Sequence, residues 1–105
     1  MTPHLSRGIA LFNAREFFEC HEVLEEEWTH EQPPRRLFLQ ALIHLAVGFY
    51  HQQQHNPTGR DRQLSKGLKK LAGYLPRYES IDTAALYSAT VAWREHGGPF
   101  PVIRC

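Results

Sequence analysis

The amino-acid sequence predicts an all-α protein: a single-domain antiparallel bundle of four main helices with a short additional helix at the N-terminus. Three observations support this fold class. Apolar residues recur at helical spacing, prolines and cap residues separate the helical segments, and no segment shows strand alternation, a hairpin turn or an internal repeat. A chain of 105 residues has room for one core, so we expect one domain over residues 1–105. Short connections favour antiparallel neighbours, with the first helix laid across them.

The stretch Leu37–His55 predicts the central helix of the bundle. Its first 14 residues, LFLQALIHLAVGFY, contain no charge. Their apolar side chains surround the whole helix axis at about 100° per residue, which is typical of a helix enclosed by others. One polar line interrupts this surface, since four side chains fall within about 40° on the helical wheel: Gln40, His44, His51 and His55. Ala41 and Gly48 lie beside the line, and one alternative is that they leave room for a small ligand beside the histidines.

Caps and prolines place the ends of the two N-terminal helices. Thr2 followed by Pro3 predicts the N-cap and first residue of a short helix. Asn13 with Glu16 three residues later is a capping-box pattern. We therefore expect the second helix to begin at this pattern and to run to about Thr29.

The second half of the chain predicts two further helices and an extended tail. Asn56 and Pro57 end the central helix and cap a fourth helix. The buried stripe of that helix is expected to be Leu64, Leu68, Leu71 and Leu75. Asp82 is the expected cap of a fifth helix that ends at Gly97. The final segment, PFPVIRC, is apolar and is expected to pack across a groove.

The composition excludes several classes of protein. Hydrophobic residues make up 42% and charged residues 22%, with a formal net charge of +1, which is ordinary for a soluble globular protein. The apolar run is shorter than the roughly 20 residues that span a bilayer, and no signal-peptide pattern opens the chain. We therefore expect a cytoplasmic protein with no membrane partner. Cys20 and Cys105 form no CxxC pair, so we expect a buried thiol and a tail thiol.

The second predicted helix contains an HExxE pattern that runs from His21 to Glu25. These two residues are one turn apart, on the apolar face that should meet the central helix. A buried carboxylate without a partner is destabilising by on the order of several kcal/mol, so a partner is expected there. His44 or His51 of the central helix is the expected supplier if the two helices pair antiparallel.

Two interpretations of this polar site are open. In the first, six side chains form a structural or ligand-binding hydrogen-bond network: His21, Glu22, Glu25, Gln40, His44 and His51. In the second, His21, Glu25 and His51 bind a divalent metal ion, and Glu22 is the base of a metal-dependent hydrolase or lyase. Buried polar groups are more often hydrogen-bonded than metal-bound, which favours the first. The zinc-protease pattern HExxH also differs from HExxE at its second histidine.

Two charged helix faces bear on partners. An acidic face of the second helix is expected to be solvated and carries Glu16, Glu19, Glu26 and Glu27. A basic face of the fourth helix carries Arg62, Lys66, Lys69 and Lys70. The two faces could pair within the molecule or across a homodimer. A single basic stripe on a nearly neutral domain is typical of solvated surface, so nucleic acid is not an expected partner.

The motif residues resemble a known family. They are Phe12-Asn13, Phe17-Phe18-Glu19-Cys20-His21-Glu22, Leu24-Glu25 and Trp28, then Phe38-Leu39-Gln40-Ala41-Leu42-Ile43, Ala46, Tyr50-His51, Asn56 and Gly59. This set, with its FFExHExxExxW core, resembles the small prokaryotic family catalogued as domain of unknown function 309. The resemblance implies an all-α domain and no established reaction. It also implies that function would reside at the matching positions Glu19, His21, Glu22, Glu25, Trp28, Gln40 and His51.

Overall fold

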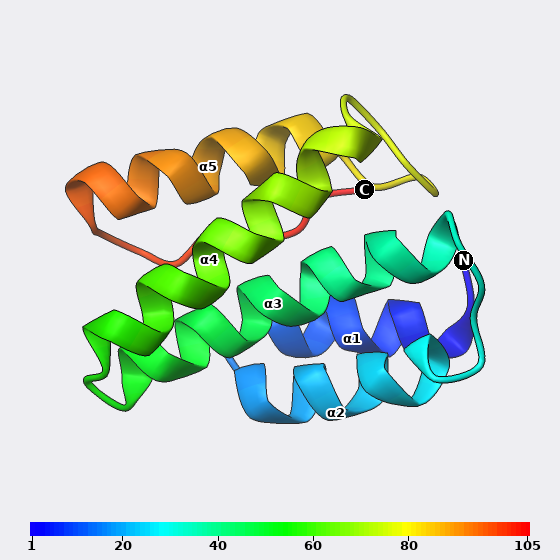
Figure 1. The fold of residues 1–105 in the computed structure, drawn as a ribbon, viewed down its shortest axis with the longest axis horizontal. Coiled ribbons are helices and arrows are strands. Elements are labelled where there is room, and N and C mark those ends of the chain that lie inside the picture. Colours follow the sequence, from blue (N-terminus) through cyan, green and yellow to red (C-terminus); the bar gives the residue numbers. More distant parts are fainter.

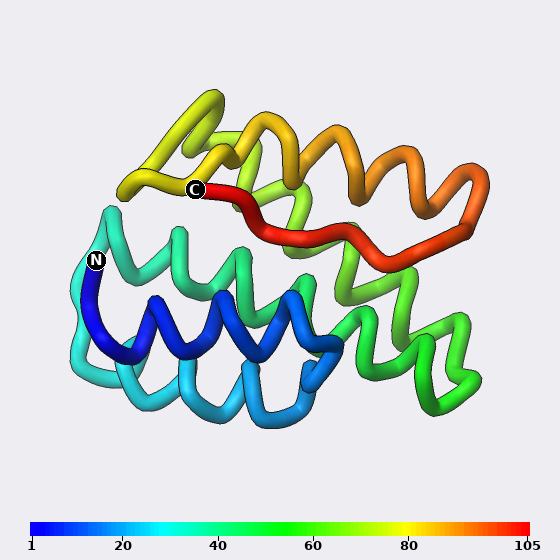
Figure 2. The backbone as a smooth tube through the Cα atoms, turned by 180° about the vertical axis from the view of Figure 1, so that it is seen from behind, coloured from blue at the N-terminus to red at the C-terminus, as the bar shows by residue number.

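The structure, a computed structural model, describes all 105 residues as a helical bundle (Figure 1). The helices are α1 (Pro3–Asn13), α2 (Phe17–Trp28), α3 (Arg35–Gln53), α4 (Pro57–Leu71) and α5 (Thr83–His96), and a short 3-10 helix, η1 (Ala72–Tyr74), follows α4. Consecutive helices run in opposite directions along the bundle (Figures 1 and 2). The predicted all-α antiparallel bundle is therefore confirmed. No helix combines the length and the apolar character needed to cross a membrane.

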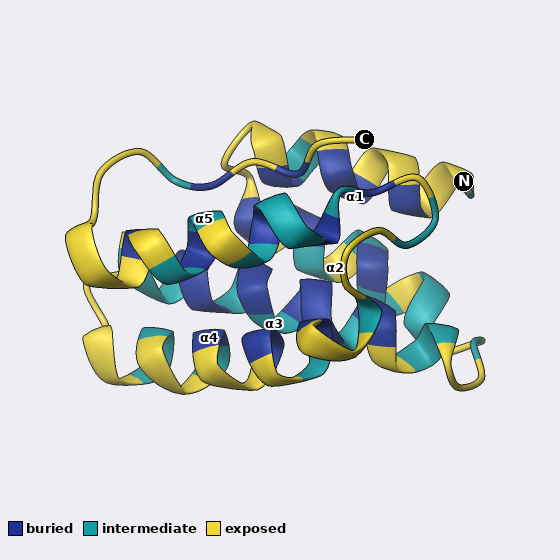
Figure 3. Ribbon diagram, turned by 90° about the horizontal axis from the view of Figure 1, so that it is seen from above, coloured by how far each residue is buried: buried dark blue, intermediate teal, exposed yellow.

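Helix α3 is the centre of the bundle, as the uncharged run predicted. It packs against α2 on one side and against α4 on the other. Its buried residues are Phe38, Leu39, Ala41, Leu42, Ile43, Leu45, Ala46, Gly48 and Phe49. Figure 3 shows that buried positions recur along the whole length of α3, whereas the outer helices bury one side only. A helix with apolar residues all round is stable in water because its neighbours cover it.

Helix α1 lies alongside α2 and not across the bundle, which differs from the expected placement (Figure 2). Gly8 explains the close packing, because a Cβ atom there would lie 2.5 Å from Cδ2 of Leu24. Contact at that distance is possible only for glycine. The predicted N-cap is confirmed, since the backbone N–H of Leu5 donates to the Thr2 hydroxyl at 3.2 Å.

The predicted capping box at Asn13 and Glu16 is wrong. Asn13 is the last residue of α1, and α2 begins at Phe17 without a side-chain cap. The Asn13 amide instead donates to the Ile103 carbonyl at 2.9 Å and accepts from the Ile103 N–H at 2.7 Å. Two hydrogen bonds to the returning backbone take the place of the two bonds of a capping box, and they hold the C-terminal segment against α1.

The C-terminal segment packs across a groove, as predicted. The Phe100 ring lies 5.2 Å from that of Phe17 and 5.4 Å from that of Phe49, between ring centroids. Pro101 and Ile103 are buried behind it. The segment therefore closes the core between α1, α2 and α5, so the chain end contributes directly to the hydrophobic core.

Helix α4 confirms most of its predicted features. The Asn56 carbonyl oxygen accepts from the Gly59 N–H at 3.0 Å, as the cap prediction requires. Leu64, Leu68 and Leu71 are buried, but Leu75 is 40% exposed because α4 ends at Leu71.

The space expected beside Ala41 and Gly48 is filled. A Cβ atom at Gly48 would lie 2.6 Å from Cδ2 of Leu64, and one at Gly67 would lie 3.1 Å from the Ala41 carbonyl oxygen. The small residues allow α3 and α4 to pack closely, and the predicted ligand space at this point is wrong.

The predictions for α5 and the cysteines also hold. The Ala85 N–H donates to the Asp82 carboxylate at 2.9 Å, which confirms the α5 cap. Cys20 is buried and Cys105 is exposed. Burial raises the pKa of the Cys20 thiol to about 12, so this thiol is unreactive at neutral pH.

Candidate functional site

Two stripes of side chains meet along one surface groove between α2 and α3, which we call the seam. From α2 the stripe is Phe18, His21, Glu25 and Trp28, and from α3 it is Gln40, Ile43, His44, Val47, Tyr50 and His51. Both stripes follow steps of three and four residues, so each lies on one face of its helix. They line two neighbouring hollows in the protein surface.

The first hollow, here the apolar hollow, has a volume of about 200 Å³ and mostly apolar walls. It is lined by Phe17, Phe18, His21, Val47, Tyr50 and His51. The Phe18 ring lies 5.4 Å from the Tyr50 ring and 5.1 Å from the His21 ring, between centroids. Phe18 is 46% exposed, so an aromatic side chain forms the open rim of this hollow.

The second hollow, here the polar hollow, has a volume of about 120 Å³. It is lined by Glu25, Trp28, Gln40, Ile43 and His44. The indole N–H of Trp28 is buried and has no acceptor within the chain. The Arg36 guanidinium lies over the Trp28 ring, 3.9 Å from the centroid, which fixes the indole in place. An unused hydrogen-bond donor and a carboxylate therefore belong to two residues that line the same hollow.

His21 and Glu25 form an ion pair that separates the two hollows. The imidazole Nε2 lies 2.8 Å from the Glu25 carboxylate, and Nδ1 donates to the Phe18 carbonyl at 2.8 Å. The side chains are 22% and 47% exposed, respectively. The expectation that Glu25 is buried is therefore wrong. Its partner is one turn away on its own helix because the HExxE turn lies at the edge of the α2–α3 contact.

His44 lies on the α4 side of the seam. Its Nδ1–H donates to the Gln63 carbonyl oxygen at 2.7 Å. Burial lowers the pKa of His44; the hydrogen bond to Gln63 acts in the opposite direction, and the charges of Lys70 and Lys66 lower it further. The imidazole is therefore neutral at physiological pH, with a lone pair on Nε2.

One ring nitrogen of His51 also faces the start of α4. The Asn56 amide donates to His51 Nδ1 at 3.4 Å, so the ring hydrogen is on Nε2. No hydrogen bond or ion pair joins His44 or His51 to the His21 and Glu25 pair. The expected direct contact is therefore absent, although His51 shares the apolar hollow with His21.

The remaining candidates lie in different places. Glu22 is exposed and lines neither hollow of the seam, but it lines a third, open hollow of about 400 Å³ with His21 and Glu25. Gln40 lines the polar hollow. His55 is exposed and lies beyond the end of α3. No group of three His, Cys, Asp or Glu side chains in the structure is arranged to hold a metal ion. His21 and Glu25 are the two predicted metal ligands that the structure brings together.

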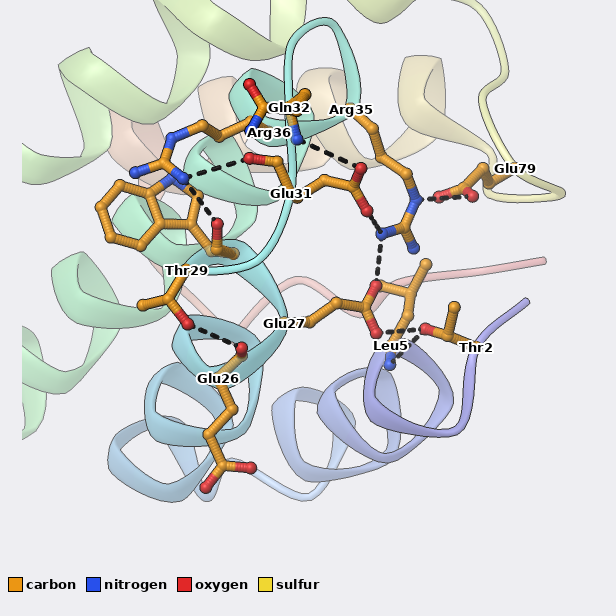
Figure 4. Close-up of polar contacts among 11 residues, drawn as sticks. Thr2, Leu5, Glu26, Glu27, Thr29, Glu31, Gln32, Arg35, Arg36 and Glu79 are labelled. Carbon is orange, nitrogen blue, oxygen red and sulfur yellow. Dashed lines mark hydrogen bonds and ion pairs between the residues drawn. The ribbon is translucent and has the colours of Figure 1, made fainter.

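A second polar cluster, centred on Arg35, did not emerge from the sequence (Figure 4). Arg35 Nη1 lies 2.9 Å from the Glu31 carboxylate and Nε lies 2.8 Å from the Glu79 carboxylate. Glu27 also pairs with Nη1, and the Thr2 hydroxyl donates to the other oxygen of Glu27. We call these five residues the Arg35 cluster. The Glu27 side chain is 12% exposed, so the prediction that it is solvated is wrong.

The electrostatics of the Arg35 cluster are those of a structural junction. Burial alone would lower the pKa of Arg35, but hydrogen bonds to Glu79, Glu27 and Glu31 outweigh it and raise the pKa. The cluster joins the start of α1, the end of α2, the start of α3 and the loop before α5 (Figure 4). No hydrophobic residue lines the hollow of about 510 Å³ beside it, whereas small-molecule sites are lined mostly by hydrophobic and aromatic side chains.

The acidic face of α2 does not pair with the basic face of α4 within the molecule. The ion pairs of α2 go to Arg35, to His21 on the same helix and, from Glu26, to His4 on α1. The predicted intramolecular pairing of the two faces is therefore wrong, because α3 lies between these helices (Figure 1).

Comparison with known proteins places this structure in a family. Residues 5–63 match the family model described as "Domain of unknown function (DUF309)". The chain is also 38% identical over 58 residues to "Uncharacterized protein YpuF" of Bacillus subtilis (strain 168). That similarity covers 54% of this chain and 33% of YpuF, so the chain matches about a third of that relative's length. The matched segment includes every residue of the seam, and more than half of the chain is matched. The chain therefore belongs to the DUF309 family, as the FFExHExxExxW motif indicated.

Proposed function

We propose that this protein is a small-ligand-binding module and that the seam between α2 and α3 is its binding site. One observation carries the proposal: an apolar hollow of about 200 Å³ adjoins a polar hollow of about 120 Å³, on either side of the His21 and Glu25 pair. Together they reach the lower end of the roughly 300–1,000 Å³ typical of small-molecule sites. Apolar walls with a few convergent polar groups are also typical of such sites.

The arrangement of hydrogen bonds favours ligand binding over a purely structural network. A network that fixes helix register would join side chains across the seam and leave few of them exposed. Here His21 pairs within α2, while His44 and His51 pair with residues beyond α3. Glu25 is 47% exposed. The polar groups of the seam are therefore held in position by neighbours while their remaining atoms stay free.

The metal-dependent interpretation has less support. A zinc-type site needs three or four protein ligands, whereas the seam brings together two, His21 and Glu25. Glu22, the candidate base, shares an open hollow with His21 and Glu25, but these three side chains are not arranged to hold a metal ion. A titration with Zn²⁺ followed by elemental analysis of untagged protein tests this alternative directly.

Two further predictions concern the protein as a whole. The exposed acidic residues of α2 and the basic face of α4 lie on opposite sides of α3, which suits head-to-tail contact between copies (Figure 1). Light scattering at low and high salt tests for such a homo-oligomer, which should dissociate as salt screens the charges. The cytoplasmic location stays a prediction, and cell fractionation tests it.

Chemical-shift mapping tests the binding proposal. Indole, benzyl alcohol and isobutanol are titrated into the ¹⁵N-labelled protein. Amide shifts should concentrate on the α2 and α3 residues that line the apolar hollow. Val47→Phe should fill the hollow and weaken these shifts at least severalfold, whereas Val102→Phe, on the exposed C-terminal segment, should leave them unchanged. Shifts scattered over the surface, or insensitive to Val47→Phe, would overturn the proposal.

A further inference from the structure

We infer that the ligand of the seam is a free α-amino acid with an apolar side chain, which lies in the apolar hollow while the ammonium and carboxylate groups occupy the polar hollow. This inference rests on the proposed function, because it names the chemical class that the seam binds. It follows from the shape of the two hollows and from the presence of both hydrogen-bond acceptors and donors among the residues of the polar hollow.

The spacing of the hollows suits a short amphipathic molecule. Val47 lines the apolar hollow and Ile43 lines the polar hollow, and these residues are four positions apart on α3. That separation is about one helical turn, or roughly 5.4 Å. A phenylalanine side chain extends over a similar distance from its α-carbon. The aromatic rim formed by Phe18 and Tyr50 provides a surface for its apolar end.

Two acceptors among the residues of the polar hollow suit an ammonium group. Glu25 uses Oε2 to pair with His21, which leaves Oε1 to accept a hydrogen bond. No lysine or arginine on α2 competes for this carboxylate. Across the hollow, the free lone pair on His44 Nε2 is a second acceptor. A charge-assisted hydrogen bond from an ammonium to a carboxylate is stronger than a neutral one.

Other groups of the same hollow suit a carboxylate. The indole N–H of Trp28 is buried and lacks an acceptor, and a buried unpaired donor is destabilising by about 1–3 kcal/mol. Gln40, on the α3 wall, adds two amide N–H donors. Lys66 and Lys70 contribute positive charge on the His44 side. Acceptors and donors are therefore present together in the polar hollow, and this combination is complementary to a zwitterion, not to a simple anion or cation.

Four related probes separate the parts of this inference by isothermal titration calorimetry with the full chain. They are L-phenylalanine, phenethylamine, 3-phenylpropionate and L-phenylalanine amide. L-phenylalanine should bind about tenfold more tightly than each of the other three, because each lacks one charged group and a charge-assisted hydrogen bond contributes about 1.5–3 kcal/mol. Equal binding by phenethylamine would exclude the carboxylate contact, and equal binding by 3-phenylpropionate would exclude the ammonium contact. Either result overturns the inference.

Two variants assign the contacts to residues. Glu25→Gln should weaken L-phenylalanine and phenethylamine and leave 3-phenylpropionate unchanged. Trp28→Phe keeps an aromatic ring under Arg36 but removes the N–H, so it should weaken L-phenylalanine and 3-phenylpropionate and leave phenethylamine unchanged. Glu26→Gln is the matched control, since it removes a carboxylate from the same helix outside both hollows. Circular dichroism verifies that each variant is folded. Equal effects of a variant on all probes would contradict the assignment.

The outcomes distinguish this inference from the proposed function. If indole and benzyl alcohol shift the seam residues but L-phenylalanine binds no better than its analogues, the ligand class is wrong and the binding site stands. If neither the fragment probes nor the four phenyl compounds bind at the seam, both proposals fall.

Discussion

Helix α2 contributes to two polar clusters, the Arg35 cluster and the seam, and they use the same kinds of residue to opposite effect. In the Arg35 cluster, Glu27 is 12% exposed and pairs with a guanidinium from another helix. In the seam, Glu25 is 47% exposed and pairs with His21 on its own helix. The first pairing joins segments far apart in the chain, whereas the second fixes a side chain within one helical turn. The pair of Glu27 with Arg35 can therefore stabilise the fold, whereas the pair of Glu25 with His21 positions the Glu25 side chain.

The pairing of charges inside the fold separates the two clusters further. The Arg35 guanidinium contacts three carboxylates through Nε and Nη1, although Nη2 and the second oxygen of Glu79 are buried without a hydrogen-bond partner. In the seam, Glu25 is 47% exposed and keeps one oxygen outside its pair with His21. On this basis we call the Arg35 cluster closed and the seam open: the closed cluster contributes to stability, and the open one can contribute to recognition. Substitutions that cost stability should thus concentrate at Arg35, and substitutions that alter binding should concentrate at the seam.

The largest expected effect on stability is that of Arg35→Met. The side chain keeps its length but leaves Glu27 and Glu79 without a counter-charge, and removing one partner of a buried pair is destabilising by roughly 3 kcal/mol or more. Urea unfolding measures the change. Arg7→Met, at an exposed position of α1, is the control and should stay within about 0.5 kcal/mol of the parent. A loss below about 1 kcal/mol for Arg35→Met would mean that the Arg35 cluster is not the structural junction inferred here.

A matched pair of substitutions compares the clusters directly. Glu27→Gln and Glu25→Gln make the same chemical change two residues apart on α2. Glu27→Gln should destabilise the protein by about 1–3 kcal/mol, because it removes a charge-assisted hydrogen bond from a mostly buried site. Glu25→Gln should cost less than about 1 kcal/mol, since a half-exposed pair is screened by solvent. The difference in the free energy of unfolding between the variants is the measurement. Equal losses would remove the distinction between a closed and an open cluster.

Local signals in the sequence were sufficient for the fold class and for the central helix, but not for the placement of α1. The uncharged run of α3 indicated the central helix because an apolar surface on every side can be covered only by neighbouring helices. Thr2, Asn56 and Asp82 marked helix starts correctly, since a cap bonds to a backbone group three residues away. Each of these inferences depends on residues within one or two turns of each other.

The Arg35 cluster could not be predicted in this way, because its members come from distant parts of the chain. Arg35 and Glu79 are 44 residues apart, and no periodicity connects them. Glu27 lies on the polar face of the α2 wheel, and the return of the chain into α3 covers that face. Asn13 shows the same limit, since its partner Ile103 is 90 residues away.

The sequence predicted the polar residues of the seam but not the groups with which they form hydrogen bonds. Its polar residues were selected because a helical wheel shows which side chains share a face. The wheel does not show which neighbouring helix that face meets. His44 bonds to Gln63 of α4, so the histidine line lies toward α4 at that point and not toward the HExxE turn. The regular stripe from Gln40 through Ile43 and Val47 to Tyr50 was the available signal for the hollows, since its spacing follows one helix face.

The smallest expected effect is a pH dependence that separates the two clusters. Burial lowers the pKa of His44 below its ordinary value of 6.5, so the unfolded chain binds a proton more readily than the folded one. Stability should therefore fall as pH drops from 6.5 toward the lower pKa of the folded state. Glu31, in the Arg35 cluster, has its pKa lowered by hydrogen bonds from the Gln32 N–H and from Arg35. The stability that Glu31 contributes is complete at pH values above the ordinary glutamate pKa of 4.5, and it is lost as pH falls below that value.

Urea unfolding between about pH 7 and pH 5 should thus report on the seam, and unfolding below pH 4.5 on the Arg35 cluster. His44→Gln should flatten the dependence of the unfolding free energy on pH between about pH 7 and pH 5, and it should leave the dependence below pH 4.5 unchanged. Glu31→Gln should flatten the dependence below pH 4.5 and leave the range between about pH 7 and pH 5 unchanged. His55→Gln, at an exposed position beyond α3, should retain the slope of the parent near pH 6. If His44→Gln leaves the slope between pH 7 and 5 intact, the buried imidazole does not govern the acid response of the seam. The free Nε2 lone pair assigned to His44 then loses its support, because that lone pair exists only while the ring is neutral.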